Sequence, residues 1–184
     1  MLAEVADEEG PDTSAIPRIL GASVVVGVLA GVAVIAYLTV EHALQGLLWE
    51  TIPDALGGTP AWWVFAVLVV GAVGVWLALK LPGHGGHRPL DGLGIDIGPK
   101  QIVSVVTAAL ISLSIGAVVG PEAPLMAIGS AVGGFVAMRS TAPVRKVLML
   151  AGAVAAITMI LGNPMVSAVL VLEAAALKGS PGGK

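Results

Sequence analysis

The sequence predicts an all-α integral membrane protein, a multi-helix bundle in which long spanning helices are combined with short, broken ones. Of its 184 residues, 57% are hydrophobic and only 11% are charged, whereas a soluble domain carries about 25% charged residues. The apolar runs are interrupted by Gly and Pro rather than by charged residues. Backbone polar groups in lipid must be satisfied within the segment, so runs of this kind predict helices.

One membrane domain is predicted between two tails. Residues 1–17 are acidic and contain two prolines, which favours a disordered tail over a secretory signal, since a signal starts with basic residues. Residues 18–177 form the membrane domain, and residues 178–184 a flexible C-terminal tail. The chain has no cysteine, which excludes disulfides and thiolate metal sites.

Six apolar segments are predicted as helices, and they differ in length. In chain order they cover residues 19–37, 62–79, 102–119, 125–138, 147–161 and 165–177. Arg139, Arg145 and Lys146 are expected to mark a surface loop between the fourth and the fifth. The first two segments are expected to be the long spans, because a bilayer core of about 30 Å needs roughly 20 apolar residues. The later ones are separated by Gly and Pro breaks, a pattern that transporters use to place ion sites near the membrane midplane.

The charged residues between these segments predict the orientation. Residues 50–61 form a predicted loop without Lys or Arg, followed by Trp62 and Trp63 at the expected membrane interface. The next loop contains Lys80, Arg88 and Lys100. Because basic residues collect on the cytoplasmic side, we expect a multi-pass cell-membrane protein with its N-terminus in the cytoplasm.

Small residues at a spacing of four predict where helices approach each other. Gly27 and Gly31 form one such pair, and Gly129 and Gly133 form another. This pattern is typical of close helix–helix packing in membranes.

A single carboxylate, that of Glu122, stands far from any other charge in the apolar part of the chain. Pro121 precedes it and Pro124 follows it, which ends one helix and begins the next. A helix N-terminus favours anions, and an ionisable residue at membrane depth indicates function. We therefore expect the N–H groups of residues 122–126 to face an anion site. The alternative is a proline kink in which Glu122 only caps its own helix.

The glycine-rich loop of residues 82–92 contains two histidines three positions apart, but no third metal ligand nearby. It also lacks the Gly-Lys-Ser/Thr of a nucleotide-binding loop. A backbone nest for an anion and a plain connection both remain open for this loop. No metal site and no cofactor is expected, and the chain shows no basic, aromatic-rich surface for nucleic acid.

These residues resemble the first half of a ClC-type voltage-gated chloride channel or anion–proton antiporter. Residues 120–124 (Gly-Pro-Glu-Ala-Pro) are similar to the family's Gly-Arg-Glu-Gly-Pro gate motif. The stretch from Leu161 to Pro164, with Glu173 nine residues beyond, is similar to its Phe-Asn-Ala-Pro…Phe-Ile-Ile-Glu segment. Residues 83–89 stand where the family has Gly-Ser-Gly-Ile-Pro. The fold implied is the first of two inverted repeats.

The resemblance implies a set of site residues. It makes Glu122 the gate and Glu173 a second acidic site. The anion-binding residues that it implies are Gly120, Pro121, Glu122, Ala123, Pro124, His84, Gly85 and Gly86. The chain departs from the family pattern at Pro121 and Ala123, and Ala174 stands where antiporters of the family carry another Glu.

The resemblance implies transmembrane transport of an inorganic anion, chloride by analogy, through a pathway that needs a second half-chain or a homo-oligomer. One alternative is a coupled anion–proton exchanger, and another is a non-conducting, truncated helical subunit. Enzymatic function is not expected, because no nucleophile–base pair or metal cluster is visible in the sequence.

Overall fold

The structure is a computed structural model that describes residues 16–81, 99–118 and 120–177. These residues form helices and no strand, which confirms the all-α fold class. The predicted tails, apart from Ile16 and Pro17 at the start of the first helix, and the glycine-rich loop with His84, Gly85 and Gly86 lie outside the described residues. The helices are α1 (Ile16–Gly46), η2 (Leu47–Thr51), α2 (Ile52–Ala55), α3 (Ala61–Ala78), α4 (Pro99–Ser114), α5 (Glu122–Val136), α6 (Ala142–Leu161) and α7 (Pro164–Leu177).

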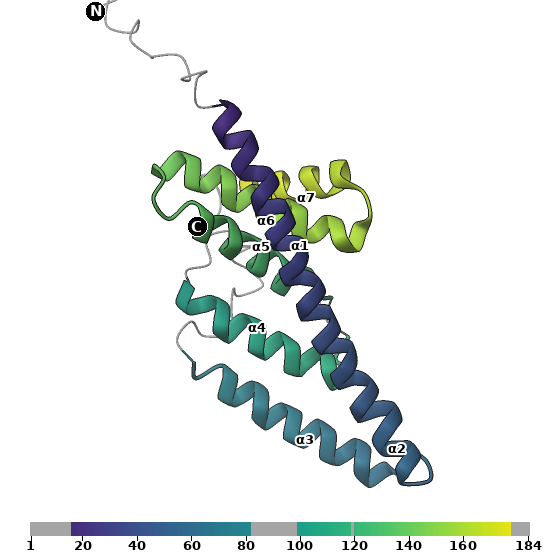
Figure 1. Cartoon of the computed structure of the whole chain (residues 1–184). Helices are drawn as coiled ribbons and strands as arrows, with labels where there is room; N and C mark the ends of the chain where they lie inside the picture. Colours follow the sequence, from purple (N-terminus) through teal and green to yellow (C-terminus); the bar gives the residue numbers. More distant parts are fainter. Residues whose placement is uncertain (1–15, 82–98, 119, 178–184) are drawn as a thin grey trace, which may run out of the picture.

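The first helix is the longest element and crosses the rest of the bundle diagonally (Figure 1). At 1.5 Å per residue, α1 is about 46 Å long, so it exceeds a bilayer core and must tilt to stay within it. It continues through the π-helical turn η2 into α2. The predicted loop of residues 50–61 is therefore wrong at its start, and only residues 56–60 connect to α3.

The helices α3 and α4 form an antiparallel pair. Gly71 lies against Ile115, and Gly74 against Ile111. At the other end of the pair the Ser104 hydroxyl donates to the Ala78 carbonyl at 2.8 Å.

The centre of the molecule is the antiparallel pair α5 and α6. A Cβ at Gly129 would meet the Gly152 carbonyl, and one at Gly133 would meet the Leu148 carbonyl. The glycine pair of α5 is thus a packing face, as predicted. In α1, a Cβ added at Gly27 would lie 4.0 Å from the Ala155 Cβ, whereas one added at Gly31 would meet no atom within 4 Å.

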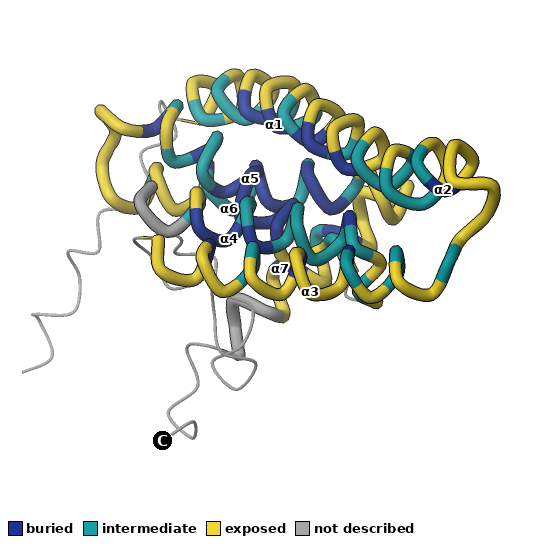
Figure 2. Tube along the Cα trace, turned by 90° about the horizontal axis from the view of Figure 1, so that it is seen from below, coloured by how far each residue is buried: buried dark blue, intermediate teal, exposed yellow. Residues whose placement is uncertain are grey.

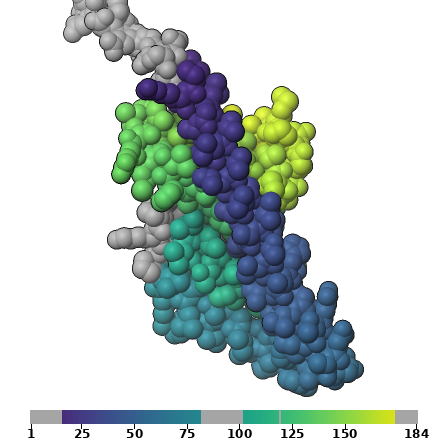
Figure 3. All heavy atoms as spheres, viewed as in Figure 1, coloured from purple at the N-terminus to yellow at the C-terminus, as the bar shows by residue number. Residues whose placement is uncertain are grey.

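Buried positions lie where α1 faces the helices beneath it, as the dark-blue segments of Figure 2 show. Val34 and Tyr37 of α1 pack with Leu125 and Ile128 of α5. Met126 of α5 joins a second cluster that reaches α6 and α7 through residues Ala153, Ile157 and Val171. Figure 3 shows α1 passing between the light-green atoms around the end of α5 and the start of α6 and the yellow atoms of α7 on the visible face.

Three helical segments, rather than the two expected, are long and apolar enough to cross a membrane: Ile16–Ala55, Ala61–Ala78 and Ala142–Leu161. The difference lies in α6, which begins at Ala142. Arg145 and Lys146, predicted to mark a surface loop, lie in its first turns and are exposed. Thr141 in extended conformation and Pro143 early in the helix favour this start.

The described Lys and Arg residues all stand at helix ends that the packing brings to the same side of the bundle. The start of α6 packs against α1 near its beginning, since Val144, Leu148, Val26 and Ala22 share a cluster. Antiparallel pairing places the end of α3 beside the start of α4, and the end of α5 beside the start of α6. The residues of this basic end are Arg18, Lys80, Lys100, Arg139, Arg145 and Lys146.

Candidate functional site

The candidate site is the break between α4 and α5. Its first part is the C-terminal end of α4. Gly116 has φ +88°, a conformation that glycine adopts without strain. The N–H of Gly116 donates to the Leu113 carbonyl, and that of Ala117 to the Ser112 carbonyl. This pair of bonds is a Schellman motif. The helix therefore stops at Ser114, five residues before the predicted boundary at residue 119.

The next helix starts at Glu122 after Pro121. The Glu122 side chain folds back, and its carboxylate occupies the space that a Cβ of Gly120 would need. Glycine at position 120 is thus what allows this conformation. The side chain of Glu122 is exposed on the chain as it stands.

Few N–H groups are free at the start of α5. Leu125 donates its N–H to the Pro121 carbonyl at 3.1 Å, and Pro124 has no N–H to donate. The helix geometry leaves the N–H groups of Glu122 and Ala123 without a carbonyl in a preceding turn. Within the predicted donor set of residues 122–126, Leu125 and Pro124 therefore offer no free N–H.

The start of α7 differs from the start of α5. The Asn163 side chain accepts hydrogen bonds from the N–H groups of Met165 and Val166, at 3.0 and 3.3 Å. Gly162, with φ +67°, ends α6 just before it. No side chain caps α5 in this way. Among the described residues, the predicted break at Pro164 thus has a side-chain cap, and the one at Glu122 has none.

The structure places the predicted site residues in different surroundings. Gly120, Glu122 and Ala123 are exposed, Pro121 is half-buried and Pro124 is buried. Glu173 is exposed on α7, two residues after Val171. The described part of the chain has no group of three or more His, Asp or Glu residues that could hold a metal ion.

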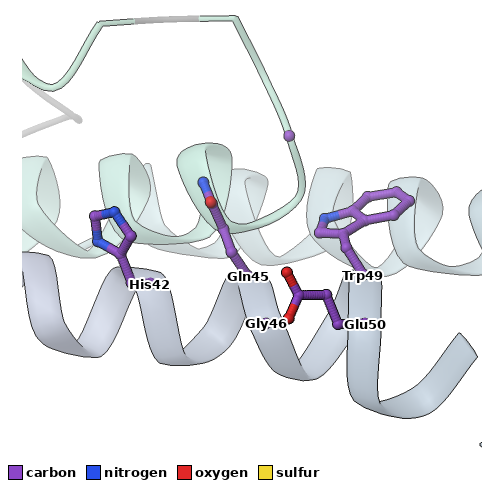
Figure 4. Close-up of a pocket in the computed structure, with 6 residues that line it drawn as sticks. His42, Gln45, Gly46, Trp49 and Glu50 are labelled. Atoms are coloured by element: carbon purple, nitrogen blue, oxygen red, sulfur yellow. The ribbon is translucent and has the colours of Figure 1, made fainter. Parts of the chain in front are cut away.

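A row of four residues on the first helix was missed by the sequence analysis. The row follows one ridge of the helix, because its members are spaced by four: Tyr37, Glu41, Gln45 and Trp49. Gln45 and Trp49 donate hydrogen bonds to carbonyls at the end of α4, and Glu41 accepts one from Gln45. Gln45 and Trp49 also line a pocket of about 420 Å³ together with His42, Gly46, Glu50 and Gly116. Figure 4 shows His42, Gln45 and Trp49 rising from α1 and η2 on one side. The spacing of four polar or aromatic residues in an apolar helix was the signal that could have found them.

Comparison with known proteins shows the family of the chain. The family model described as voltage gated chloride channel matches residues 84–181, which include α4 to α7 and the Glu122 break. The chain belongs to this family. No solved structure matches it.

Relatives of the chain carry the name "Putative ion-transport protein YfeO". The protein of Escherichia coli O17:K52:H18 (strain UMN026) is 26% identical over 157 residues. Those of E. coli O139:H28 (strain E24377A) and Shigella boydii serotype 4 (strain Sb227) are each 27% identical over 158 residues. Each match covers 80% of this chain but 37% of the relative. The chain therefore spans a little over a third of the length of these relatives.

Proposed function

We propose that this membrane chain contributes one part of a transmembrane anion pathway in which Glu122 is the gate. The observation that carries the proposal is the start of α5, where the N–H groups of Glu122 and Ala123 are left open while the Glu122 carboxylate folds back over Gly120. A helix N-terminus stabilises negative charge. The Glu122 carboxylate and a permeating anion would compete for the same positively polarised N-terminus of α5.

Protonation of Glu122 is the step that opens this site. The neutral side chain loses its attraction to the helix start, so it can leave and an anion such as chloride can take its place. The proposed contacts of the anion are the N–H groups at the start of α5, with the loop containing His84, Gly85 and Gly86 as a second group. Glu173 is proposed as a further acidic position that affects proton access or stability.

The remaining part of the pathway is proposed to come from further chain, either a second copy or additional sequence. Both Glu122 and the break at Pro164 are exposed. In lipid, unsatisfied backbone groups at such breaks cost several kcal/mol each. A partner surface that covers them would remove that cost and complete the pathway.

The basic end of the bundle is proposed to lie in the cytoplasm. The described Lys and Arg residues gather there, while Glu41, Glu50 and Asp54 stand near the opposite end. Positive residues are retained on the cytoplasmic side during insertion. The N-terminus would then be cytoplasmic, and α5 would begin away from the cytoplasmic end.

Glu122→Gln tests the gate directly. Anion flux through the protein assembled in liposomes is measured from about pH 4 to about pH 8, a range that covers ordinary carboxyl titration. The variant imitates the protonated state, so its flux should be high throughout and nearly independent of pH. Asp54→Asn removes another exposed carboxylate, in α2, and should keep the pH dependence of the unmodified protein. A Glu122→Gln profile identical to that of the unmodified protein would contradict the gate.

The capping alternative gives a different result. If Glu122 only stabilises its helix, Glu122→Gln lowers the unfolding free energy by about 1 kcal/mol or less, and the pH profile of flux is unchanged. Measuring thermal unfolding on the same samples separates the two explanations.

A further inference from the structure

The end of α4 is held by two side chains from the first helix. The Gln45 side-chain nitrogen donates to the Leu113 carbonyl at 3.1 Å, and the Trp49 indole nitrogen donates to the Ser114 carbonyl at 2.9 Å. These bonds join residues 68 and 65 positions apart in the sequence. Together with the Schellman bonds to Ser112 and Leu113, they supply donors to the last carbonyls of α4.

We propose that Gln45 and Trp49 are positioning residues, which determine where the chain leaves α4 on its way to Glu122. We refer to them, with Glu41, as the α1 clamp. The positioning of the end of α4 rests on the hydrogen bonds of Gln45 and Trp49 alone. Its consequence for transport rests on the proposed role of Glu122.

The orientation of the Gln45 amide follows from its two partners. Its nitrogen donates to the Leu113 carbonyl and also to the Glu41 carboxylate, and both partners are acceptors. Only the NH₂ group can serve two acceptors at once. Glu41 is buried, with its side chain 7% exposed, and therefore provides a fixed second anchor for the amide.

Glu41 is itself held by His42. The Nδ1 atom of His42 lies 3.1 Å from the Glu41 carboxylate and 2.7 Å from the Leu38 carbonyl. Since both neighbours accept, Nδ1 carries a hydrogen. In the described part of the chain, the titratable groups around the α1 clamp are thus Glu41, His42 and Tyr37, which lies one turn before Glu41, together with Glu50 in the lining of the same pocket.

The π-helical turn η2 carries Trp49 into the clamp. The Trp49 ring also lies beside Gly116, where an added Cβ would be 3.8 Å from the ring. The Trp63 indole in turn donates to the Leu48 carbonyl at 3.0 Å, which satisfies a carbonyl within the π turn. Isolated π turns in α-helices are frequent at functional sites.

These contacts act on the segment before the gate. Gly116 stands six residues before Glu122. Its position is set by the hydrogen bonds of the Schellman motif and by the neighbouring Trp49 ring. Loss of the Trp49 bond leaves the Ser114 carbonyl without that donor, in surroundings where such groups are costly. Loss of the Gln45 bond leaves the Leu113 carbonyl with the Gly116 N–H as its remaining donor. The end of α4 can then loosen, and the direction of approach to Glu122 changes.

The test uses a spin label close to the clamp. The chain has no cysteine, so Val118→Cys introduces a unique labelling site at a fully exposed position. Gln45→Met removes the amide and keeps a side chain of similar length. Trp49→Phe keeps an aromatic ring near Gly116 and removes the indole N–H. The matched control is Thr39→Val, because Thr39 bonds only to Ile35 of its own helix.

In each clamp variant, the ratio of mobile to immobile label should rise about fivefold. This is the change in an equilibrium constant expected for the loss of one hydrogen bond. Thr39→Val should leave it unchanged. An unaltered label in both clamp variants, or an equal increase in Thr39→Val, overturns the proposal. If Gln45→Met fails to insert into detergent or lipid, Trp49→Phe still decides the question.

Anion flux provides the second measurement and separates positioning from stability. Gln45→Met should shift the pH profile of flux, and this shift should vanish in a Glu122→Gln background. A shift that persists in that background overturns the positioning role. If Glu122→Gln itself leaves the profile unchanged while the label still responds, the gate proposal fails and the clamp is supported.

Discussion

At the scale of single residues, glycines decide how closely the central helices approach. The backbones of α5 and α6 touch at Gly129 and Gly152, where each glycine faces the carbonyl of the other. Such contact needs the absence of a side chain, because helix association in lipid depends on close packing rather than on the hydrophobic effect.

Gly129→Ala is expected to destabilise the protein by about 1–3 kcal/mol, because the added methyl group collides with backbone that cannot rotate away. Thermal unfolding in detergent measures the change. Gly31→Ala on α1 is the control, since no atom lies within 4 Å of the new Cβ. It should be neutral or stabilising by up to about 1 kcal/mol. Equal melting temperatures for the two variants would contradict the packing shown here.

Gly120→Ala tests the resting position of the gate. Its Cβ would occupy the space that the Glu122 carboxylate now fills, so the carboxylate must move away. We expect a flux profile shifted toward that of Glu122→Gln, with little change in the melting temperature. Gly21→Ala, at a position without neighbours within 4 Å, should show the profile of the unmodified protein.

At the scale of elements, the helix ends differ in how their backbone groups are satisfied. The end of α4 uses a glycine turn and side chains from α1, and the end of α3 uses Ser104. The start of α7 uses Asn163. The start of α5 has no such cap, which agrees with a site kept open for a ligand.

Asn163→Ala should weaken the start of α7 by about 0.5–2 kcal/mol, the usual loss for an N-cap. Asn163→Asp keeps an acceptor at the same place and should be close to the unmodified protein. Hydrogen exchange of the amides of Met165 and Val166 measures this locally. Slow exchange in Asn163→Ala, equal to that of the unmodified protein, would show that the cap does not stabilise the helix.

At the scale of the whole molecule, the arrangement of helices places the described Lys and Arg residues at one end, and Glu41, Glu50 and Asp54 near the other. Antiparallel pairing brings Arg18, Lys80 and Arg139 to one side although they are distant in the sequence. The residues that connect α2 to α3 lie at the other side (Figure 1). A bilayer placed across the long helices would therefore separate these two ends.

Single cysteines test this orientation in the cysteine-free chain. Thr59→Cys and Ser140→Cys are both at exposed positions, one on each side. A membrane-impermeant maleimide added to intact cells should label residue 59 and reach residue 140 only after permeabilisation. The reverse pattern would place the N-terminus outside.

A single copy of the 184-residue chain is expected to give no selective anion flux in liposomes. The reason is the exposure of both helix breaks, which need a covering surface in lipid. Flux measured together with the oligomeric state of the purified chain tests this. Selective flux from a sample shown to be monomeric would contradict the need for further chain.

Much of the fold could be predicted from local patterns. The helices α3, α5 and α7 match their predicted segments within three residues at each end, because apolar runs, prolines and glycines act through nearby backbone. The errors lie at helix boundaries that were placed from residue type alone. Gly116 was read as part of an apolar run, so α4 was extended to residue 119, and Arg145 and Lys146 were read as a loop although they fit an exposed helical turn.

The sequence by itself determined that this is a helical membrane protein with breaks at Pro121 and Pro164, and it identified Glu122 as the isolated carboxylate. These features depend on composition and on backbone restrictions that act within a few residues. Only the tertiary structure decided that Gln45 and Trp49 reach the end of α4, and that Gly129 meets Gly152. Such contacts join residues far apart in the chain, and a pattern within one segment does not specify which partner helix will supply the donor or the space.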